Sequence, residues 1–320
     1  MNLSIRPFTH GLHDLGSGGY AWIQPDGGWG WSNAGLIVDG DESLLVDTLF
    51  DLKLTREMLK AMSRAEPTAA QSFNTLVNTH ANGDHCNGNE LVHGAEIISS
   101  VATAAELAEE SPDRLATMMR NAPSLGEAGE FLQRCFGAFD FEGITPTLPT
   151  RTFEGTMNVS VGDKEVRLKQ VGPCHTKGDI LAYVPDDKLI FTGDILFIEG
   201  HPILWVGPIA NWIDACDYML GIDVETVVPG HGPITDKRGV TAVRDYLVYI
   251  RDEANKRYRA GLPVYEAAMD ISLTDYDNWG DAERIVINVA TLYREFGSTE
   301  KTGDLFSLMA KADKARRQAT

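Results

Sequence analysis

The chain of 320 residues is strongly acidic, with 46 Asp and Glu against 28 Lys and Arg and a formal net charge of -18. Such a charge repels phosphate backbones and anionic lipid, which argues against nucleic acid and membrane partners and favours a small-molecule substrate. A hydrophobic content of 43% is that of a globular protein, which excludes disorder and fibres and allows one large domain or two modest ones.

Cysteine usage and hydropathy point to a cellular compartment. Four cysteines are too few for a disulfide scaffold at this length. Residues 1–7 lack the long apolar run of a signal peptide, and no stretch approaches the roughly 20 apolar residues of a membrane span. The sequence therefore predicts a cytoplasmic protein.

The opening third reads as strands joined by turns. The strand-like runs 33–39 and 43–47 flank Gly40-Asp41, which is typical of a hairpin turn. The segment 20–31 reads as a glycine-rich turn that carries aromatic residues.

A helix and a buried strand follow. Apolar residues recur at helical spacing from Leu54, with Asp51 as a plausible N-cap. The apolar run 73–79 is then a buried strand that leads directly into His80. Strand, helix and strand in this order predict a layered α/β architecture.

Residues 101–140 interrupt this pattern with three short helical segments rich in Ala, Met and Phe. The apolar residues of this insert predict either an adaptable lid or a homodimer surface: Met118, Met119, Phe131, Phe136 and Phe139. Four strand-like segments come next, at 159–161, 166–171, 180–184 and 189–192. The insert thus lies between two halves of a sheet-rich body.

The end of the chain is helical. Two sets of apolar residues recur at helical spacing, Val243 to Ile250 and Ile285 to Phe296. The polar tail from Lys301 is expected to fray. We expect a main domain over residues 1–235 and a helical extension over 236–320 that packs on the same domain.

Metal-capable side chains gather in four short segments at the ends of apolar runs. The segments are His80-Ala81-Asn82-Gly83-Asp84-His85, Gly172 to Asp179, Phe191-Thr192-Gly193-Asp194 and Val228-Pro229-Gly230-His231. Glycine beside a ligand candidate lets the backbone turn sharply and present the side chain to a cleft. Imidazole nitrogen with carboxylate oxygen suits zinc, and also manganese or iron.

The four segments in this order resemble the metallo-β-lactamase superfamily, whose signature is H-x-H-x-D-H, then a distant His, a Gly-Asp and a final Gly-His. The resemblance covers roughly residues 8–235. It implies an αββα sandwich, in which two sheets lie face to face with helices outside, and a metal site built from loops at one edge.

The resemblance also implies a role for each matching residue. His80 and His175 would bind the first ion, Asp84, His85 and His231 the second, and Asp194 would bridge them, with Asp84 and Asp194 as the catalytic carboxylates. Asp47 matches an acidic residue at a strand end, where it either orients a ligand or serves only as a turn residue.

One position departs from the signature, because Asn82 stands where the second histidine is expected. A neutral amide offers only its carbonyl oxygen and is a poorer ligand than imidazole. We therefore expect weaker binding at the first site, which gives either a mononuclear enzyme filled at the second site or a pair of ions with unequal affinity. The alternative is that Asn82 coordinates well enough to hold both ions.

A bound ion would lower the pKa of its water to about 7 and supply hydroxide for attack on a carbonyl carbon. The sequence has no Ser–His–Asp pattern with a nucleophile elbow, so covalent catalysis is not required. Cys86 and Cys174 adjoin ligand candidates, where they are either reactive thiolates or buried packing residues.

Four further residues are candidates for substrate contact. Trp29 and Trp31 would clamp a flat or apolar substrate if their loop overhangs the site, or else anchor the core. His201 is either a proton donor to the leaving group or a structural histidine. Lys177 either meets a substrate carboxylate or faces solvent.

These features predict a hydrolase for a carbonyl ester, thioester or lactone of a bulky, largely apolar molecule. A non-hydrolytic enzyme on the same scaffold, such as an aromatic or polyketide cyclase or an iron-dependent oxygenase, is the alternative, because an altered first site favours oxygen-loving ions. A binding protein without chemistry would need an empty metal site, whereas the ligand candidates are intact here.

Overall fold

The computed structural model describes residues 2–319 and contains two β-sheets packed face to face. The first sheet holds seven strands in chain order: β1 (Gly11–Gly16), β2 (Gly19–Ile23), β3 (Ala34–Asp39), β4 (Glu42–Val46), β5 (Thr75–Val77), β6 (Glu96–Ser100) and β7 (Arg151–Phe153). The second sheet has the order β12 (Thr226–Val228), β11 (Leu189–Phe191), β10 (Ile180–Val184), β9 (Lys164–Gln170) and β8 (Thr156–Val161).

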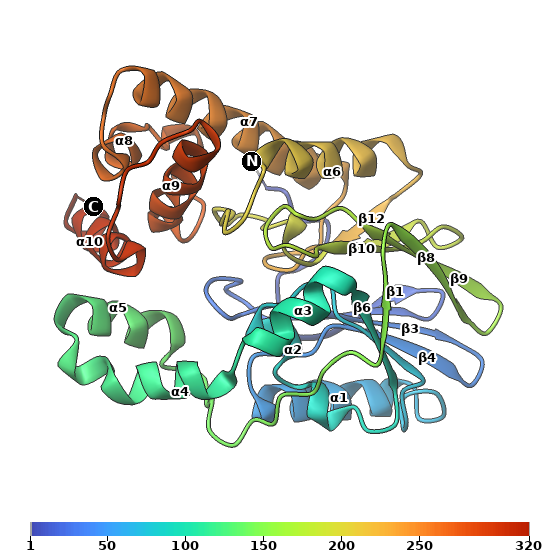
Figure 1. Ribbon diagram of the computed structural model, residues 1–320. Coiled ribbons are helices and arrows are strands. Elements are labelled where there is room, and N and C mark those ends of the chain that lie inside the picture. Colours follow the sequence, from blue (N-terminus) through green and yellow to red (C-terminus); the bar gives the residue numbers. More distant parts are fainter. Residues whose placement is uncertain (1, 320) are drawn as a thin grey trace.

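Ten α-helices surround the sheets in the described part of the chain. They are α1 (Leu52–Ala65), α2 (Gly83–Cys86), α3 (Val101–Glu109), α4 (Pro112–Asn121), α5 (Gly126–Phe136), α6 (Ile209–Gly221), α7 (Lys237–Arg259), α8 (Val264–Asp270), α9 (Ile285–Glu295) and α10 (Leu305–Ala319). Five short 3-10 turns join them: η1 (Asn89–Leu91), η2 (Ala122–Ser124), η3 (Gly193–Ile195), η4 (Thr274–Tyr276) and η5 (Ala282–Arg284). In Figure 1, α1 lies beyond the first sheet, while α6 and α7 lie beyond the second.

The alternation of side chains along each strand explains why the sheets stack. In β4, Leu44 and Val46 point into the core between the two sheets, whereas Leu45 belongs to the core on the outer face. There Leu45 shares a cluster with Met58 and Met62 of α1. Since successive strand residues face opposite sides, one apolar strand supplies two cores. The predicted αββα sandwich is confirmed.

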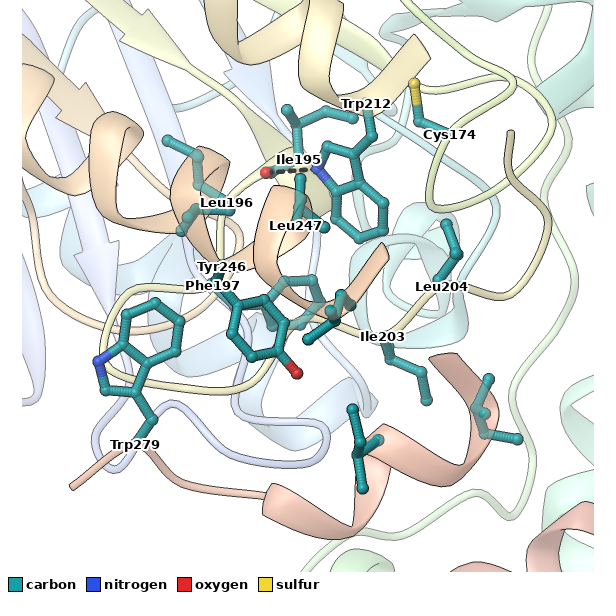
Figure 2. Close-up of a cluster of buried hydrophobic side chains, with 14 of the residues drawn as sticks. Cys174, Ile195, Leu196, Phe197, Ile203, Leu204, Trp212, Tyr246, Leu247 and Trp279 are labelled. Carbon is teal, nitrogen blue, oxygen red and sulfur yellow. Dashed lines mark hydrogen bonds between the residues drawn. The ribbon is translucent and has the colours of Figure 1, made fainter. Parts of the chain in front are cut away.

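The second sheet is covered by a larger apolar cluster that joins it to the C-terminal helices. Figure 2 shows part of this cluster, in which the Trp212 indole of α6 donates a hydrogen bond of 2.9 Å to the carbonyl of Ile195. Tyr246 of α7 and Trp279 lie close together in the same region, with ring centroids 5.5 Å apart. The helices after residue 235 therefore pack directly on the sandwich.

Several local predictions hold, and two do not. Gly40 forms the turn between β3 and β4, and the Asp51 side chain accepts a hydrogen bond from the Leu54 backbone N–H at the start of α1. Residues 20–22, however, are part of β2, which begins at Gly19 and ends at Ile23, so the turn comes only after the strand. Most of the predicted fraying tail is instead helical, since α10 spans Leu305–Ala319 and buries Met309 against the other helices.

The helical insert and the C-terminal helices contact each other. Phe131 of α5 packs against Phe306 of α10 with ring centroids 5.0 Å apart, and Arg134 of α5 pairs with Asp313 of α10. In Figure 1 the α4–α5 pair and α10 lie on the same side of the sandwich. Among residues 2–319, no helix is both long and apolar enough to cross a membrane.

Candidate metal centre

The predicted ligands converge at one edge of the sandwich because parallel strands end there. β4 and β5 run parallel in the first sheet and lead into Asp47 and His80. β11 and β12 run parallel in the second sheet and lead into Asp194 and His231. The carboxyl ends of parallel strands share an edge, so side chains far apart in sequence meet.

Asp194 lies at the middle of the cluster. Its Oδ2 atom is 3.3 Å from His175 Nε2, 3.5 Å from His80 Nε2 and 3.5 Å from His231 Nε2. Its Oδ1 atom is 3.1 Å from His85 Nε2. A carboxylate in contact with four imidazoles has the position expected for a group shared between two ions.

The residues predicted for the second ion also come together. α2 places Asp84 and His85 on one turn, and Asp84 Oδ2 lies 3.2 Å from His231 Nε2 and 3.8 Å from His85 Nε2. One potential ligand atom from each of these three residues lies within 4.8 Å of the others. The same holds for His80, His85 and Asp194.

Every histidine of the cluster is oriented by a hydrogen bond at its other ring nitrogen. The His85 Nδ1 atom lies 3.0 Å from Asp47 Oδ2, and the His80 Nδ1 atom lies 3.0 Å from Thr79 Oγ1. The His175 Nδ1 atom lies 2.7 Å from the Ile203 carbonyl oxygen, and the His231 Nδ1 atom lies 3.1 Å from the Gly27 carbonyl oxygen. Each acceptor fixes the proton on Nδ1 and leaves the Nε2 lone pair facing the cluster.

Asp47 also fixes the strand end behind His80. Its carboxylate accepts hydrogen bonds from the backbone N–H of Thr79 at 2.7 Å and from the Thr79 hydroxyl at 2.6 Å, as well as from His85. Asp47 therefore has the contacts of a residue that orients ligands, which favours the first of the two readings of this position.

Buried atoms without hydrogen-bond partners show that the cluster fits a divalent cation. His80 Nε2, His85 Nε2 and Asp194 Oδ1 have no hydrogen bond, although all three residues are at least 96% buried. Polar atoms left unpaired in the interior are costly, and convergent imidazole and carboxylate lone pairs are the donor set of transition-metal sites. A cation would satisfy all three atoms at once.

The ionisation of the cluster reflects its mutual contacts. Burial opposes the charged form of Asp194, but the surrounding histidines, His231 first, outweigh burial and hold its pKa below the usual range. For His231, burial is likewise outweighed by Asp194 and Asp84, which raise its pKa to about 9. A metal ion that binds His231 must therefore displace a proton from its imidazole.

Asn82 faces His175, its Oδ1 atom 2.7 Å from His175 Nε2. Because His175 Nδ1 carries its proton toward the Ile203 carbonyl, and burial lowers the pKa of His175 to about 3, its Nε2 is an acceptor. Two acceptor lone pairs at this distance repel each other unless a cation lies between them or the amide turns its NH₂ toward His175. Asn82 is thus close enough to share an ion with His175, whereas a rotated amide would donate its NH₂ to His175 Nε2 and block the ion.

Two positions beside the candidate ligands require glycine, because neighbouring side chains lie too close to their backbone for a Cβ atom to fit. A Cβ atom on Gly230 would lie 2.0 Å from Asp194 Oδ1. One on Gly193, whose φ is +49°, would lie 2.4 Å from Thr79 Oγ1. Side chains at these positions would push Asp194 and the strand end apart, so the sequence motif preserves the packing behind the ligands.

The ligand cluster forms part of the wall of a cavity of about 580 Å³. Asn82, Asp84, His175, Asp194 and His231 line it together with largely apolar side chains, among them Phe50, Leu115, Phe136, Ile144, Ile203 and Trp205. At its rim Leu148 is 45% exposed, and Trp205 and Val206 are each 36% exposed. The cavity therefore offers a polar, metal-capable patch within an apolar surface that extends to solvent.

Comparison with known proteins identifies the family. The family model of the metallo-beta-lactamase superfamily matches residues 27–231. The chain belongs to the metallo-beta-lactamase superfamily. This superfamily has divalent metal ions in its active sites, and the chain is accordingly a hydrolase with a candidate metal-binding cluster of histidines and aspartates.

Individual relatives of this superfamily are distant. The "Acyl-coenzyme A thioesterase MBLAC2" of Gallus gallus is 24% identical over 240 residues, which cover 71% of this chain and 82% of that enzyme. The sec-alkylsulfatase Pisa1 from Pseudomonas sp. has a TM-score of 0.68 at 15% identity over 91% of this chain, and the chain spans only 51% of its length. A metallo-beta-lactamase from Pontibacter korlensis has a TM-score of 0.55 at 18% identity, covering 74% and 97% of the two chains.

The two tryptophans predicted to contact the substrate differ in their positions relative to the cavity. Trp29 lines the cavity. Trp31 does not contribute to the wall and packs instead on Phe139, with ring centroids 4.7 Å apart. The glycine-rich loop therefore brings one indole to the site and uses the other as a core anchor.

His201 and Lys177 do not line the cavity. His201 is fully buried between Tyr246 and Trp279 outside the cavity wall, and burial lowers its pKa to about 3, which favours the structural alternative for this histidine over the proton donor. The Lys177 side chain is 57% exposed and lies 3.6 Å from Glu106, which leaves it facing solvent rather than the cavity.

The cysteines next to the ligands are packing residues. Cys86 and Cys174 are buried and their thiols donate to the backbone carbonyls of His80 and Val171. Burial raises the pKa of both thiols above the usual range, so they are protonated at neutral pH.

Sequence reasoning missed the contribution of the C-terminal region to the site. Arg284 of η5 lines the cavity, and its neighbour Glu283 contacts Trp29 from behind. Neither residue belongs to a motif, and Trp29 and Glu283 are 254 positions apart. The only sequence signal near these residues was the apolar pattern that begins at Ile285, and this pattern predicted a helix rather than a contribution to the site.

Proposed function

We propose that this chain hydrolyses thioesters of bulky, apolar acyl groups with metal-activated water, and that related esters are secondary substrates. The superfamily supports hydrolysis, and the match to an acyl-coenzyme A thioesterase over 82% of that enzyme supports a thioester as the bond that is cleaved. The apolar walls support an acyl group as the part that is bound.

One observation carries the proposal: the ligand cluster lies within the wall of a cavity whose rim exposes Leu148, Trp205 and Val206. Large apolar side chains left in water at the mouth of a cavity are characteristic of a surface that binds an apolar partner. An acyl chain would cover this rim while its carbonyl carbon lies at the polar patch.

The proposed chemistry divides between the ion and the protein. A bound divalent ion supplies a water of lowered pKa and polarises the carbonyl oxygen. His80, Asn82 and His175 would hold one ion, and Asp84, His85 and His231 the other, with Asp194 shared. The side chain of Asp84 is 13% exposed, against 4% for Asp194, so Asp84 is the carboxylate placed to accept a proton from the attacking water.

Zinc is the ion that we propose, because four imidazoles and carboxylates suit it. Asp47, Thr79 and the backbone carbonyls of Ile203 and Gly27 supply the orienting contacts described above whichever ion is bound. Iron or manganese is the alternative ion, and its presence would favour the alternative function, a non-hydrolytic enzyme on the same scaffold. The homodimer contact through the insert remains a prediction.

A substrate panel tests the proposal. Zinc-loaded protein would be assayed with acetyl, hexanoyl and dodecanoyl thioesters, an aryl ester, a lactone and a secondary alkyl sulfate. We expect kcat/KM for the thioesters to increase at least roughly ten-fold from acetyl to dodecanoyl, since burial of only about two of the additional methylenes, at about 0.8 kcal/mol each, produces that factor. The separate rates of thiol release and oxygen uptake identify the reaction class.

Two results would count against the proposal. A preference for the acetyl over the dodecanoyl thioester would show that the apolar cavity does not bind the acyl chain. Oxygen consumption by iron-loaded protein without thiol release would favour the oxygenase reading instead.

A further inference from the structure

Trp29 occupies a position where three parts of the chain meet the cavity. Its indole lies edge-on to Phe136 of the insert, with ring centroids 5.8 Å apart, and tilted against Trp205 of the rim at 6.5 Å. Glu283 and Arg284 of η5 contact it from the C-terminal region. An aromatic wall of a cavity binds an apolar group best when its orientation is fixed before binding.

Glu283 fixes the edge of the indole. The Trp29 Nε1–H donates a hydrogen bond of 2.7 Å to Glu283 Oε1, and Glu283 is only 7% exposed. A buried indole N–H needs an acceptor, and a carboxyl group held in the interior provides a directional one. The hydrogen bond therefore sets the rotation of the ring in its plane.

Arg284 fixes the face of the indole. Its guanidinium carbon lies 4.4 Å from the Trp29 ring centroid, and the residue is 2% exposed. The guanidinium is itself held by the Asp281 carboxylate at 2.8 Å and the His201 carbonyl at 3.0 Å. A buried cation over an indole face is strongly attracted to it, so the ring cannot tilt without losing this contact.

The same arginine connects Trp29 to the metal centre. Its guanidinium carbon is also 5.1 Å from the Phe197 ring centroid. Phe197 in turn stacks on the imidazole of His231, with an interplanar angle of 6° and ring centroids 5.0 Å apart. Arg284 thus contacts both Trp29, in the cavity wall, and Phe197, which stacks on the candidate ligand His231. Arg284 lies outside the region that matches the superfamily model, which ends at residue 231.

We propose that Glu283 and Arg284 are positioning residues that hold Trp29 as the fixed wall for the apolar part of the substrate. This inference rests on the proposed function, since it assumes an apolar acyl group in the cavity. It assigns to the C-terminal region a part in substrate selection that the superfamily match does not cover.

The test uses zinc-loaded full-length protein and two thioether analogues, octyl and ethyl, in which a methylene replaces the carbonyl so that hydrolysis is impossible. Titrations give their affinities for wild type, Glu283→Leu, Glu283→Gln and Arg284→Met. We expect the octyl affinity to fall about ten-fold in Glu283→Leu and Arg284→Met, and the ethyl affinity to change less than about two-fold. Glu283→Gln should restore most of the affinity, because its amide oxygen accepts the indole N–H.

A double-mutant cycle with Trp29→Phe separates positioning from a general loss of stability. Phenylalanine has no N–H, so Glu283→Leu should have no further effect in that background. The ¹⁵N resonance of the Trp29 indole should shift in Glu283→Leu and return toward its original position in Glu283→Gln. Trp31→Phe and Glu300→Gln are matched controls outside the cavity wall, and both should bind the octyl analogue as wild type does.

The outcomes distinguish this inference from the proposed function. If wild-type protein hydrolyses thioesters but the substitutions at 29 and 283 act additively and equally on both analogues, the positioning role is wrong and the function stands. If no thioester is hydrolysed while the octyl analogue binds with the predicted coupling, the thioesterase proposal is wrong and the apolar wall stands.

Discussion

Replacing Asp194 by asparagine is expected to lower thioester hydrolysis by at least roughly 100-fold, because even residues that only orient metal ligands contribute about 10- to 100-fold. Asp194 touches all four imidazoles of the cluster, at 3.1 to 3.5 Å. The amide keeps the shape of the side chain but removes the charge that both ions would share. Metal content and kcat/KM measured on the same sample check this prediction.

A matched carboxylate serves as the control. Asp187 is also partly buried and ion-paired, with Lys164, but it lies outside the cavity wall. Asp187→Asn should therefore retain both metal and activity. If Asp194→Asn retained full metal content and turnover while remaining folded, the cluster would not be the reacting centre.

Replacing Asn82 by histidine is expected to strengthen metal binding at the first site by about ten-fold or more, since it restores an imidazole ligand. In the wild type the amide oxygen lies beside His175 Nε2. Rotation of the amide would place its NH₂ against that nitrogen and compete with metal binding. A histidine at position 82 whose Nε2 lone pair faces the cluster has no N–H to donate to His175 Nε2, so it would not compete with the metal ion in this way. After dialysis against a weak chelator, the variant should retain more metal per chain than the wild type.

The series at position 82 tests the reason for the effect. Asn82→Ala removes the donor and should hold less metal than the wild type, whereas Asn82→Asp replaces a neutral oxygen by a charged one and should hold more. Two ions bound with equal affinity by the wild type, and no gain in Asn82→His, would show that the asparagine is a full ligand.

The candidate metal centre was predictable because its signals are local in sequence. Three of the four ligand segments follow short apolar strands, and glycines stand beside the ligands at Gly193-Asp194 and Gly230-His231, so the motif itself specifies a strand end that turns into a cleft. The sandwich was predictable for a related reason, since a continuously buried apolar strand such as β4 requires an apolar layer on each face.

The substrate wall was not predictable, because it depends on contacts between distant segments. Trp29 and Trp31 have the same local sequence environment, and only the positions of Glu283 and Phe139 decide which indole faces the cavity. His201 lies in an apolar run that leads from the metal centre, but the run turns into the core toward Tyr246. Periodicity also did not show that α10 packs on α5.

The most direct test is to remove the metal and restore it in steps. Protein stripped with a chelator would be titrated with zinc, and bound metal and the rate of dodecanoyl thioester hydrolysis would be measured at each step. Turnover should be lost in the stripped protein and return in proportion to the zinc bound by the Asp84, His85, His231 and Asp194 cluster. Undiminished hydrolysis by folded, metal-free protein would contradict the account.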